Sequence, residues 1–586
     1  MMEAGRKTQI AEALLDPTEP AGDEWWRGAM FYEVYLRSFV DSNGDGIGDL
    51  PGLISRLDYI KSLNVDGLWL SPFYPSPQED FGYDVSDLCD VDPMFGTLED
   101  FDRLIAEAHE RDLRVLIDVV PCHTSEQHEW FLESRSGPDN DKADWYVWAD
   151  SGPDGGPPNN WLSSFGGPAW TWEPRRSQYY YHPFLECQPS LNLRNPEALE
   201  AVLGVFRFWL DRGVDGFRLD AIQCLTCDPL FRSNPPSPSG DRNPSLGGGA
   251  HNPFRKQLHY FDRDVPESLP ILEAIRDAVR GREPERVIIG ELADVDSTRT
   301  AVKYTKHGER LHAVYDFDLI NAVESVQDIR ELLEVREDFL GSGAVMNVFT
   351  NHDSERAVSN LTRFAVEAGK AEEAAKLLLF LQSTLQGGGI LFQGEELGLT
   401  QPELDYEDMQ DPWGKAFWPD FSGRDGVRTP LPWNGDAPHA GFTSAEKSWL
   451  PVPEPHAARA VDVQHDDPGS VLSFLSGLLA WRRETPMLRH GHEIVLRGTD
   501  TAIIAYDRFD ACCRMTFVLN FALEEAGFDV EPGDDLLDVV GTRAAHAGDR
   551  ITLEPLGFCV VRRARPEPDA AEKHAATAKG HDHETR

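Results

Sequence analysis

Eight short apolar segments alternate with amphipathic helical patterns between residues 30 and 395, and this alternation restricts the fold more than any other feature of the chain. Each segment is rich in β-branched or aromatic residues and has the length of a buried strand. Eight successive strand–helix units predict an α/β fold, a closed parallel (β/α)8 TIM barrel with its helices outside. The expected strands are Phe31–Tyr35, Val65–Leu70, Val115–Val120, Gly216–Leu219, Val287–Gly290, Ala313–Phe317, Val345–Thr350 and Gly389–Phe392.

One of the helices shows clear signals at both ends. Asn195 is a suitable N-cap, Pro196 occupies the first helical position, and Gly213 follows the last turn. Proline is favoured at the start of a helix and glycine just past its end. The sequence therefore predicts a helix that begins at Pro196 and ends shortly before Gly213.

Two segments interrupt the barrel pattern. Residues 123–187 are rich in Gly, Pro, Asn and Trp and lack helical periodicity, so an inserted domain is expected after the third strand. Residues 393–455 form a second polar, Pro-rich excursion, and later segments such as Ala502–Tyr506 indicate a C-terminal antiparallel β-domain. The expected organisation is a disordered tail at 1–23, the barrel at 24–122 and 188–487, the insert at 123–187, the β-domain at 488–565 and a disordered tail at 566–586.

The charge and composition of the chain restrict the classes of molecule that it is expected to bind. The chain has 100 acidic and 55 basic residues, a formal net charge of −45, which disfavours nucleic acid and anionic membranes and favours a neutral or cationic substrate. A solvated acidic coat explains the same charge without any role in binding. The first residues lack the apolar core of a signal peptide, and no run of 18 apolar residues occurs. With eight cysteines in 586 residues, a disulfide framework is not indicated, and a reduced, cytoplasmic monomer or homodimer is expected.

Polar residues gather where the predicted strands end. Active sites of such barrels lie at the C-terminal ends of the strands. Crowded charges cost stability unless they are paired, so such clusters tend to be functional. The residues at or just past the third, fourth, fifth and seventh strand ends are Asp118, His123, Arg218, Asp220, Glu291, His352 and Asp353.

Paired carboxylates suit the retaining cleavage of glycosides. One carboxylate attacks the anomeric carbon while the other protonates the leaving oxygen and then activates water. Arg218 precedes Asp220 by two residues on one strand, so both side chains face the same way and the cation is expected to keep Asp220 ionised. Glu291 follows the apolar run VIIG, and apolar burial beside other carboxylates predicts a raised pKa for this group, as a general acid requires.

Several segments carry a family resemblance. LIDVVPCHTS, GFRLDAI, IIGEL and FTNHDSER resemble the four signature segments of the α-amylase superfamily of glycoside hydrolases, family 13. GLWLSP, QPSLN and GILFQGEELG resemble its further segments, in the same order along the chain. DFGYDV at 80–85 and GRDGVRTPLPW at 423–433 are similar to the α-glucosidase and oligo-1,6-glucosidase branch.

The resemblance implies roles for individual residues. Asp220 would be the nucleophile, Glu291 the general acid/base, and Asp353 the residue that holds the sugar hydroxyls as the ring flattens. Asp80 would pair with Arg424 and close the pocket around a single glucose, which implies exo action. The resemblance also implies that five further residues surround the same glucose, namely Tyr83, Asp118, His123, Arg218 and His352.

The segment DSNGDGIGD at 41–49 offers oxygen ligands to a hard cation. It resembles an EF-hand loop without the glutamate at loop position 12, which is Gly52 here. We expect one structural Ca²⁺ or Mg²⁺ and no catalytic cofactor, with a loop of plain Asx turns as the alternative. The proposed ligands are Asp41, Asn43, Asp45, the carbonyl of Ile47, and Asp49.

The implied function is a retaining exo-acting α-glucosidase that releases or transfers single glucosyl units from small maltose-like or sucrose-like α-glucosides. An isomerase or synthase that makes trehalose or isomeric sucrose would use the same residues, so this alternative stays open. A non-catalytic barrel that binds sugars is a third possibility, although such proteins typically lose the catalytic carboxylates. Cys122 stands where the family usually has Asn, and Ala221 resembles the members that prefer α-1,4 linkages.

Overall fold

The computed structural model describes residues 24–237, 252–293, 297–321, 326–339, 345–496, 501–510, 513–531 and 533–564. The chain divides into two compact units, one over Asp23–Arg489 and one that begins at His490. The two terminal segments that were expected to be disordered, 1–23 and 566–586, lie outside the described residues. Among the described residues, no helix has the length and apolar character that crossing a membrane requires.

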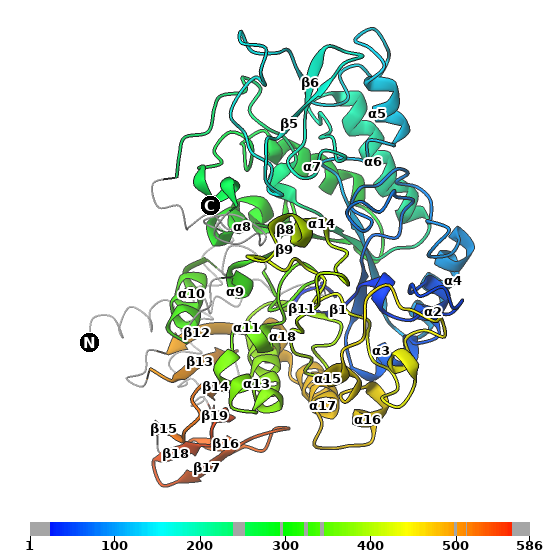
Figure 1. The fold of residues 1–586 in the computed structure, drawn as a ribbon. Helices are drawn as coiled ribbons and strands as arrows, with labels where there is room; N and C mark the ends of the chain where they lie inside the picture. The colour runs from blue at the N-terminus through cyan, green and yellow to red at the C-terminus, as the bar shows by residue number, and fades with distance from the viewer. Residues whose placement is uncertain are drawn as a thin grey trace, which may run out of the picture. The chain divides into compact units, whose positions relative to one another are not determined.

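The first unit is built on an eight-stranded parallel sheet (Figure 1). Its order is β10-β11-β1-β2-β3-β7-β8-β9, and a parallel bridge between Val314 and Val345 joins its two edges into a barrel. The predicted barrel is confirmed, with all eight strands in place and the seventh much shorter than expected. The strands are β1 Met30–Val34, β2 Gly67–Leu70, β3 Arg114–Val119, β7 Gly216–Leu219, β8 Val287–Leu292, β9 Ala313–Asp316, β10 Met346–Asn347 and β11 Gly388–Phe392.

The barrel strands are buried on both faces because side chains fill the interior and helices cover the outside. The interior is packed with large apolar groups such as Phe31, Trp69 and Leu116, each of which stabilises the fold by roughly 1.5–3 kcal/mol. The helices of this unit's barrel region are α2 Leu50–Ile54, α3 Leu57–Ser62, α4 Leu98–Glu110, α6 Pro196–Asp211, α7 Ser268–Val279, α8 Ser297–Thr305, α9 Asp318–Asn321, α10 Val326–Phe339, α11 Ala357–Asn360, α12 Arg363–Glu367, α13 Ala371–Thr384, α16 Val461–His465, α17 Val471–Glu484 and α18 Pro486–His490.

Helix α6 confirms the predicted end signals. It begins at Pro196, and the side chain of Asn195 accepts a hydrogen bond from the backbone N–H of Glu197 at 2.9 Å. Gly213, just past its end, has φ +98°, a conformation that costs glycine little. These local signals set the direction in which the chain enters β7, which carries Arg218.

The segment after β3 folds on its own small antiparallel sheet, in the order β4-β6-β5. Trp161, Trp170 and Tyr181 pack together in its core. Figure 1 shows this segment at one end of the barrel, where it supplies loops to the site described below. Its helix α5 was not predicted from the sequence. The elements are α5 Glu129–Ser134, β4 Trp148–Ala149, β5 Trp170–Glu173 and β6 Gln178–Tyr181.

The excursion after β11 contains only short helices and long loops. These are α14 Pro412–Phe417, the 3-10 turn η5 Pro438–Gly441 and α15 Glu454–Ala457. Arg428, from one of the loops, donates to the backbone carbonyl of His352 at 2.8 Å, so the excursion is anchored directly at the seventh strand end.

The second unit is antiparallel, as predicted. Five strands pair in the order β12-β13-β14-β19-β16, and three more in the order β15-β18-β17. The segment Ala502–Tyr506 that the sequence indicated corresponds to β13. The strands are β12 His492–Leu496, β13 Ile503–Phe509, β14 Cys513–Asn520, β15 Ala526–Asp529, β16 Asp535–Leu537, β17 Ala544–Ala547, β18 Arg550–Leu553 and β19 Phe558–Ala564.

Candidate active site

The carboxyl ends of β3, β7, β8 and β10 bring together the polar residues singled out in the sequence. Parallel pairing places Asp118 directly beside Arg218, and Glu291 directly beside Tyr315. Asp220 is the first residue past β7, and Ala221 then takes a left-handed conformation, φ +44°, that turns the chain sharply. The strand register therefore gathers residues that lie far apart in the sequence at one end of the barrel.

Arg218 is the centre of this cluster. Its Nη1 donates to both oxygens of Asp118 at 2.8 Å and to Oδ1 of Asp220 at 2.7 Å. Its Nη2 donates to Oε2 of Glu291 at 2.5 Å and to the hydroxyl of Tyr315 at 2.9 Å. One buried guanidinium thus serves three carboxylates, which leaves an excess of acidic groups away from water.

Burial dominates the acidity of these carboxyl groups. It raises the pKa of Glu291 to about 8, with Asp220 and Asp353 adding to the shift, and this confirms the predicted raised pKa. Burial likewise raises the pKa of Asp220 to about 7, although the charge of Arg218 opposes the shift. Arg218 lowers the pKa of Asp220, as expected, but desolvation outweighs this cation, so the net shift of the pKa is upward.

Asp353 behaves in the opposite way. Burial would raise its pKa, but His352, Arg424 and Arg428 together hold that pKa well below its usual range. Arg428 Nη2 donates to Oδ1 of Asp353 at 2.6 Å, and Arg424 Nη1 donates to the same oxygen at 3.2 Å. Asp353 is therefore an ionised carboxylate fixed by two guanidinium groups.

Asp80 and Arg424 form the predicted pair. Arg424 Nη2 donates to Oδ1 of Asp80 at 2.7 Å and also contacts Oδ1 of Asp411 at 2.9 Å. The amide of Gln188 donates to the other oxygen of Asp80 at 2.9 Å. The pair joins the loop after β2 to the excursion after β11.

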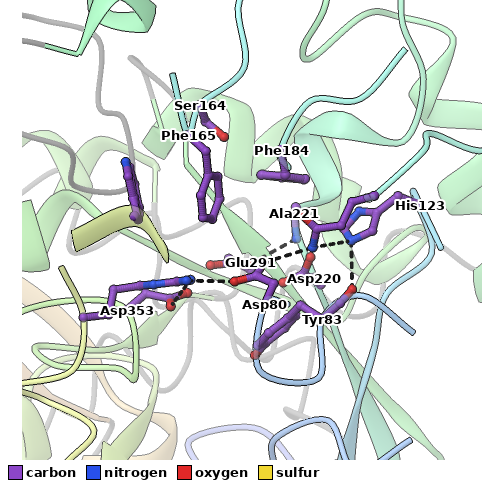
Figure 2. Close-up of a pocket in the computed structure, with 13 residues that line it drawn as sticks. Asp80, Tyr83, His123, Ser164, Phe165, Phe184, Asp220, Ala221, Glu291 and Asp353 are labelled. Carbon is purple, nitrogen blue, oxygen red and sulfur yellow. Dashed lines mark hydrogen bonds and ion pairs between the residues drawn. The ribbon is translucent and has the colours of Figure 1, made fainter. Parts of the chain in front are cut away.

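These groups surround a pocket (Figure 2). Three residues that were expected around the sugar do not line this pocket. They lie fully buried behind the lining residues, and they are Asp118, Arg218 and His352. The inserted segment contributes Phe165 and Phe184, which Figure 2 shows on the side opposite Tyr83. The lining residues are Asp80, Tyr83, His123, Ser164, Phe165, Phe184, Gln188, Asp220, Ala221, Glu291, Asp353, Trp413 and Arg424.

Comparison with known proteins agrees with this geometry. A model of the α-amylase catalytic domain matches residues 33–491. The chain belongs to the α-amylase family. A protein named "Probable alpha-glucosidase" from Rhizobium meliloti (strain 1021) is 48% identical over 520 residues, covering 88% of this chain and 92% of that protein. An oligo-1,6-glucosidase of Parageobacillus thermoglucosidasius is 34% identical over 537 residues, covering 85% and 90%.

Solved structures place the chain in the same family. The α-glucosyl transfer enzyme XgtA superposes with a TM-score of 0.88 at 46% identity, covering 92% of this chain and all of that one. The trehalulose synthase MutB from Pseudomonas mesoacidophila MX-45 gives a TM-score of 0.83 at 33% identity, covering 93% of this chain and all of that one. The family resemblance and the branch inferred from the sequence are confirmed.

Sequence reasoning missed several residues of this α-amylase family site. Phe165 and Phe184 come from loops and Trp413 from the short helix α14, and in none of these segments does periodicity tell which side chain points inward. Arg428 could have been found, because it lies in the segment GRDGVRTPLPW that already identified Arg424.

Glu33 on β1 was also missed. Its Oε1 lies 2.6 Å from Nδ1 of His352, whose Nε2 lies 2.8 Å from the hydroxyl of Tyr83. That hydroxyl donates to Oδ2 of Asp118 at 3.0 Å. Burial, with Asp353 and Asp118 nearby, raises the pKa of Glu33 well above its usual range. A protonated Glu33 therefore donates to Nδ1, so that Nε2 of the neutral His352 carries the other proton toward the site.

Asx turns hold the shape of the loop at 41–49, where a structural cation was predicted. Asp41 accepts from the backbone N–H groups of Asn43, Gly44 and Gly46, while Asp49 caps α2 through Gly52 N at 2.7 Å. The same turns occur in a loop that binds a cation and in one that does not. The oxygen set suits Ca²⁺ or Mg²⁺ by type, and the cation remains a prediction.

Proposed function

We propose that this chain is a retaining, exo-acting α-glucosidase that releases or transfers single glucosyl units from maltose-like or sucrose-like α-glucosides. The observation that supports it most is the bridging of Asp220 and Glu291 by one guanidinium, in the wall of a pocket bordered by the pair of Asp80 and Arg424. The α-glucosidases among the relatives support the same substrate class.

The bridging by Arg218 favours a retaining mechanism. Retaining enzymes hold their carboxyl groups about 5–5.5 Å apart, whereas inverting enzymes need about 6.5–9.5 Å to admit a water between them. The hydrogen bonds from Arg218 hold the carboxyl groups of Asp220 and Glu291 on one guanidinium, which keeps them near each other, as a nucleophile and its acid/base partner must be. Asp220 would attack the anomeric carbon, forming a covalent β-glucosyl-enzyme, and a water would later displace it.

Glu291 is suited to serve as acid and then as base. Its raised pKa keeps it protonated near neutral pH, and its Oε1 has no hydrogen-bond partner among the described residues. That oxygen would protonate the glycosidic oxygen as the bond to the anomeric carbon breaks. The resulting carboxylate would then take a proton from the water, or from the hydroxyl of an acceptor, that attacks the intermediate.

Asp353 would supply a fixed negative charge. Arg424 and Arg428 keep it ionised and oriented, so it needs no reorganisation as positive charge develops on the sugar ring. Arg218 and His352 would position the groups that line the pocket rather than touch the glucose directly. The pair of Asp80 and Arg424 would limit the pocket to one sugar unit, which is the basis for exo action.

An isomerase is the second candidate, because the trehalulose synthase MutB shares the fold at 33% identity. In that reaction the glucosyl unit is returned to the other half of the same disaccharide instead of to water. The carboxylates would act in the same way in hydrolysis and in isomerisation. The two reactions would differ only in whether the leaving sugar stays in the site after the bond breaks.

Product analysis separates the two candidates. Purified protein would be incubated separately with maltose, isomaltose, sucrose and trehalose, with Asp220→Asn as the inactive control. Free glucose from maltose or sucrose, first in the α-configuration, supports the proposal, and an isomeric disaccharide with little free glucose favours the isomerase. Glucose from soluble starch with a rapid fall in viscosity contradicts exo action.

The structural cation at 41–49 is part of this proposal. If the loop binds Ca²⁺ or Mg²⁺, dialysis against a chelator should lower the unfolding temperature, and adding back either ion should restore it. The variant Asp45→Ser should show no such response while its metal-free form unfolds like the metal-free parent. An unfolding temperature unaffected by the chelator leaves only the Asx turns.

The free cysteines support a reduced, cytoplasmic setting. Among the described residues, no disulfide includes any of six cysteines, which are Cys89, Cys122, Cys187, Cys224, Cys227 and Cys559. Disulfides are rare in reducing compartments, and buried thiols are tolerated there. Fractionation of cells that express the chain would test the compartment, and light scattering would distinguish a monomer from a homodimer.

A further inference from the structure

Three ligand-bearing side chains meet at one side of the pocket. Cys122, His123 and Asp220 each offer one ligand atom, and these atoms lie within 4.8 Å of one another. In the part of the chain that the structure describes, no other three His, Cys, Asp or Glu side chains form such a group. All three residues are buried, and His123 and Asp220 line the pocket.

The tautomer of His123 follows from its surroundings. Its Nε2 lies 3.0 Å from the backbone carbonyl of Tyr83, which only accepts hydrogen bonds, so Nε2 carries the proton. The side-chain nitrogen of Gln188 lies farther from Nε2, at 3.3 Å. The lone pair of His123 is therefore on Nδ1, which faces the sulfur of Cys122 at 3.2 Å.

This is the arrangement of a histidine that binds a metal. Such histidines usually donate the second ring N–H to a carbonyl or a carboxylate, which fixes the ring and directs the other nitrogen at the ion. Here the carbonyl of Tyr83 fixes the ring before any ion arrives.

The donor set selects the kind of cation. A sulfur, an imidazole nitrogen and a carboxylate oxygen are the ligands of Zn²⁺, with Zn–S about 2.3 Å and Zn–N about 2.0–2.1 Å. Ca²⁺ and Mg²⁺ take oxygen ligands instead. Oδ1 of Asp220 accepts a hydrogen bond from Arg218 at 2.7 Å, and a carboxylate has further lone pairs that can bind a cation.

We propose that Cys122, His123 and Asp220 form an inhibitory site for a borderline or soft divalent cation such as Zn²⁺, which enters through the substrate pocket. The ion would bind the sulfur, Nδ1 and a carboxylate oxygen, and the proton of the thiol would pass to solvent. Because it engages Asp220, the ion would compete with the sugar. The inhibition rests on the proposed glucosidase activity, whereas the binding itself does not.

Binding is tested without any substrate. The full chain, freed of metal with a chelator, is titrated with Zn²⁺ against a chromophoric chelator, and with Co²⁺ while the thiolate-to-cobalt absorption in the near ultraviolet is recorded. We expect one equivalent of Zn²⁺, and affinity at least tenfold weaker in both Cys122→Ser and Cys122→Ala, with the cobalt absorption lost. Cys224→Ser, a buried thiol outside the group, should keep both signals.

Inhibition is tested with 4-nitrophenyl α-D-glucoside, each variant being compared with its own metal-free rate. Zn²⁺ should raise the apparent KM of the parent and of Cys224→Ser at micromolar concentration, and Cys122→Ser should need at least tenfold more; Mg²⁺ should not inhibit. Zinc affinity and cobalt absorption that are unchanged by both Cys122 substitutions overturn the site. If the chain hydrolyses no α-glucoside, the proposed function fails while the cobalt measurement still decides this proposal.

Discussion

Strand β7 connects two charged clusters of opposite charge balance, each built around a buried ion. Before its first residue, Asp215 contacts Arg114 at 3.0 Å, Arg286 at 2.8 Å and His109 at 2.7 Å. Near its last residue, Arg218 serves three carboxylates. The amino end thus surrounds one anion with basic groups, and the carboxyl end surrounds one cation with acidic groups.

The difference in charge balance indicates that the cluster at the amino end stabilises the fold, whereas the cluster at the carboxyl end carries out the chemistry. Burial would raise the pKa of Asp215, but hydrogen bonds from His109 and from the backbone N–H of Val115 lower it below its usual value, so its charge is satisfied. At the other end, burial raises the pKa of both Asp220 and Glu291 because one guanidinium cannot satisfy all the carboxyl groups. Unsatisfied carboxyl groups near neutral pH are poised for proton transfer, and barrel enzymes use this end of the strands for catalysis.

Asp220→Asn should have the largest effect. It removes the nucleophile, and we expect kcat to fall about 10⁴-fold, equivalent to about 5.5 kcal/mol of activation free energy. The unfolding midpoint in urea should stay the same or rise, because one of three carboxylates that compete for Arg218 is gone. Rates would be measured with 4-nitrophenyl α-D-glucoside, and a residual rate above a tenth of the parent's would rule out Asp220 as nucleophile.

Asp215→Asn should lower the stability of the fold and leave the activity almost unchanged. The change removes the charge of a buried anion whose basic partners are partly exposed, so we expect a loss of about 1.5–3 kcal/mol of unfolding free energy. Below its unfolding temperature the variant should keep kcat within about twofold, since Asp215 touches no pocket residue. Urea unfolding followed by circular dichroism measures the loss; a fall in kcat with unchanged stability would contradict the division between the two ends.

Lowering the pH should affect only the carboxyl end. With a raised pKa of about 7, Asp220 takes up a proton as the pH falls below 7, and a protonated carboxyl group is a poor nucleophile. Activity should therefore fall about tenfold per pH unit, roughly 100-fold by pH 5. Asp215, whose pKa is lowered, stays ionised, so circular dichroism should report an intact fold.

Raising the pH tests the role of Glu291 as the general acid. Glu291 loses its proton above about 8, and the rate should decline again, giving a maximum between about 7 and 8. In Glu291→Gln this alkaline limb should vanish from the residual rate. An alkaline limb that persists in that variant would assign it to another group.

Glu33 should show the smallest effect. Glu33→Leu removes the donor to Nδ1 of His352 and should lower kcat/KM about tenfold, the cost of about 1.4 kcal/mol for one buried hydrogen bond. Glu33→Gln keeps an N–H in place of the O–H and should stay within about threefold of the parent. Equal losses in both variants would show that Glu33 acts as a carboxylate, contrary to its raised pKa.

Local patterns in the sequence were sufficient for the architecture. The eight strands, the caps of α6 and the C-terminal β-domain depend on interactions between near neighbours, which leave periodic and positional signals in the chain. The polar residues at the strand ends were also found in advance, because parallel strands in a barrel all end on the same side. The helix α5 and the length of β10 were not foreseen, since neither has a strong periodic pattern.

The sequence by itself thus determined the barrel, its family and the chemically active groups, Asp220, Glu291 and Asp353. Only the tertiary structure decided the pKa values, protonation states and contacts of those groups and their neighbours. That Asp220 titrates near neutral pH beside a guanidinium, that Glu33 holds a proton for His352, and that Cys122 faces Nδ1 of His123 all depend on burial and on contacts between distant segments. Desolvation and long-range contacts leave no mark on local sequence pattern, because they arise only when the strands close into a barrel.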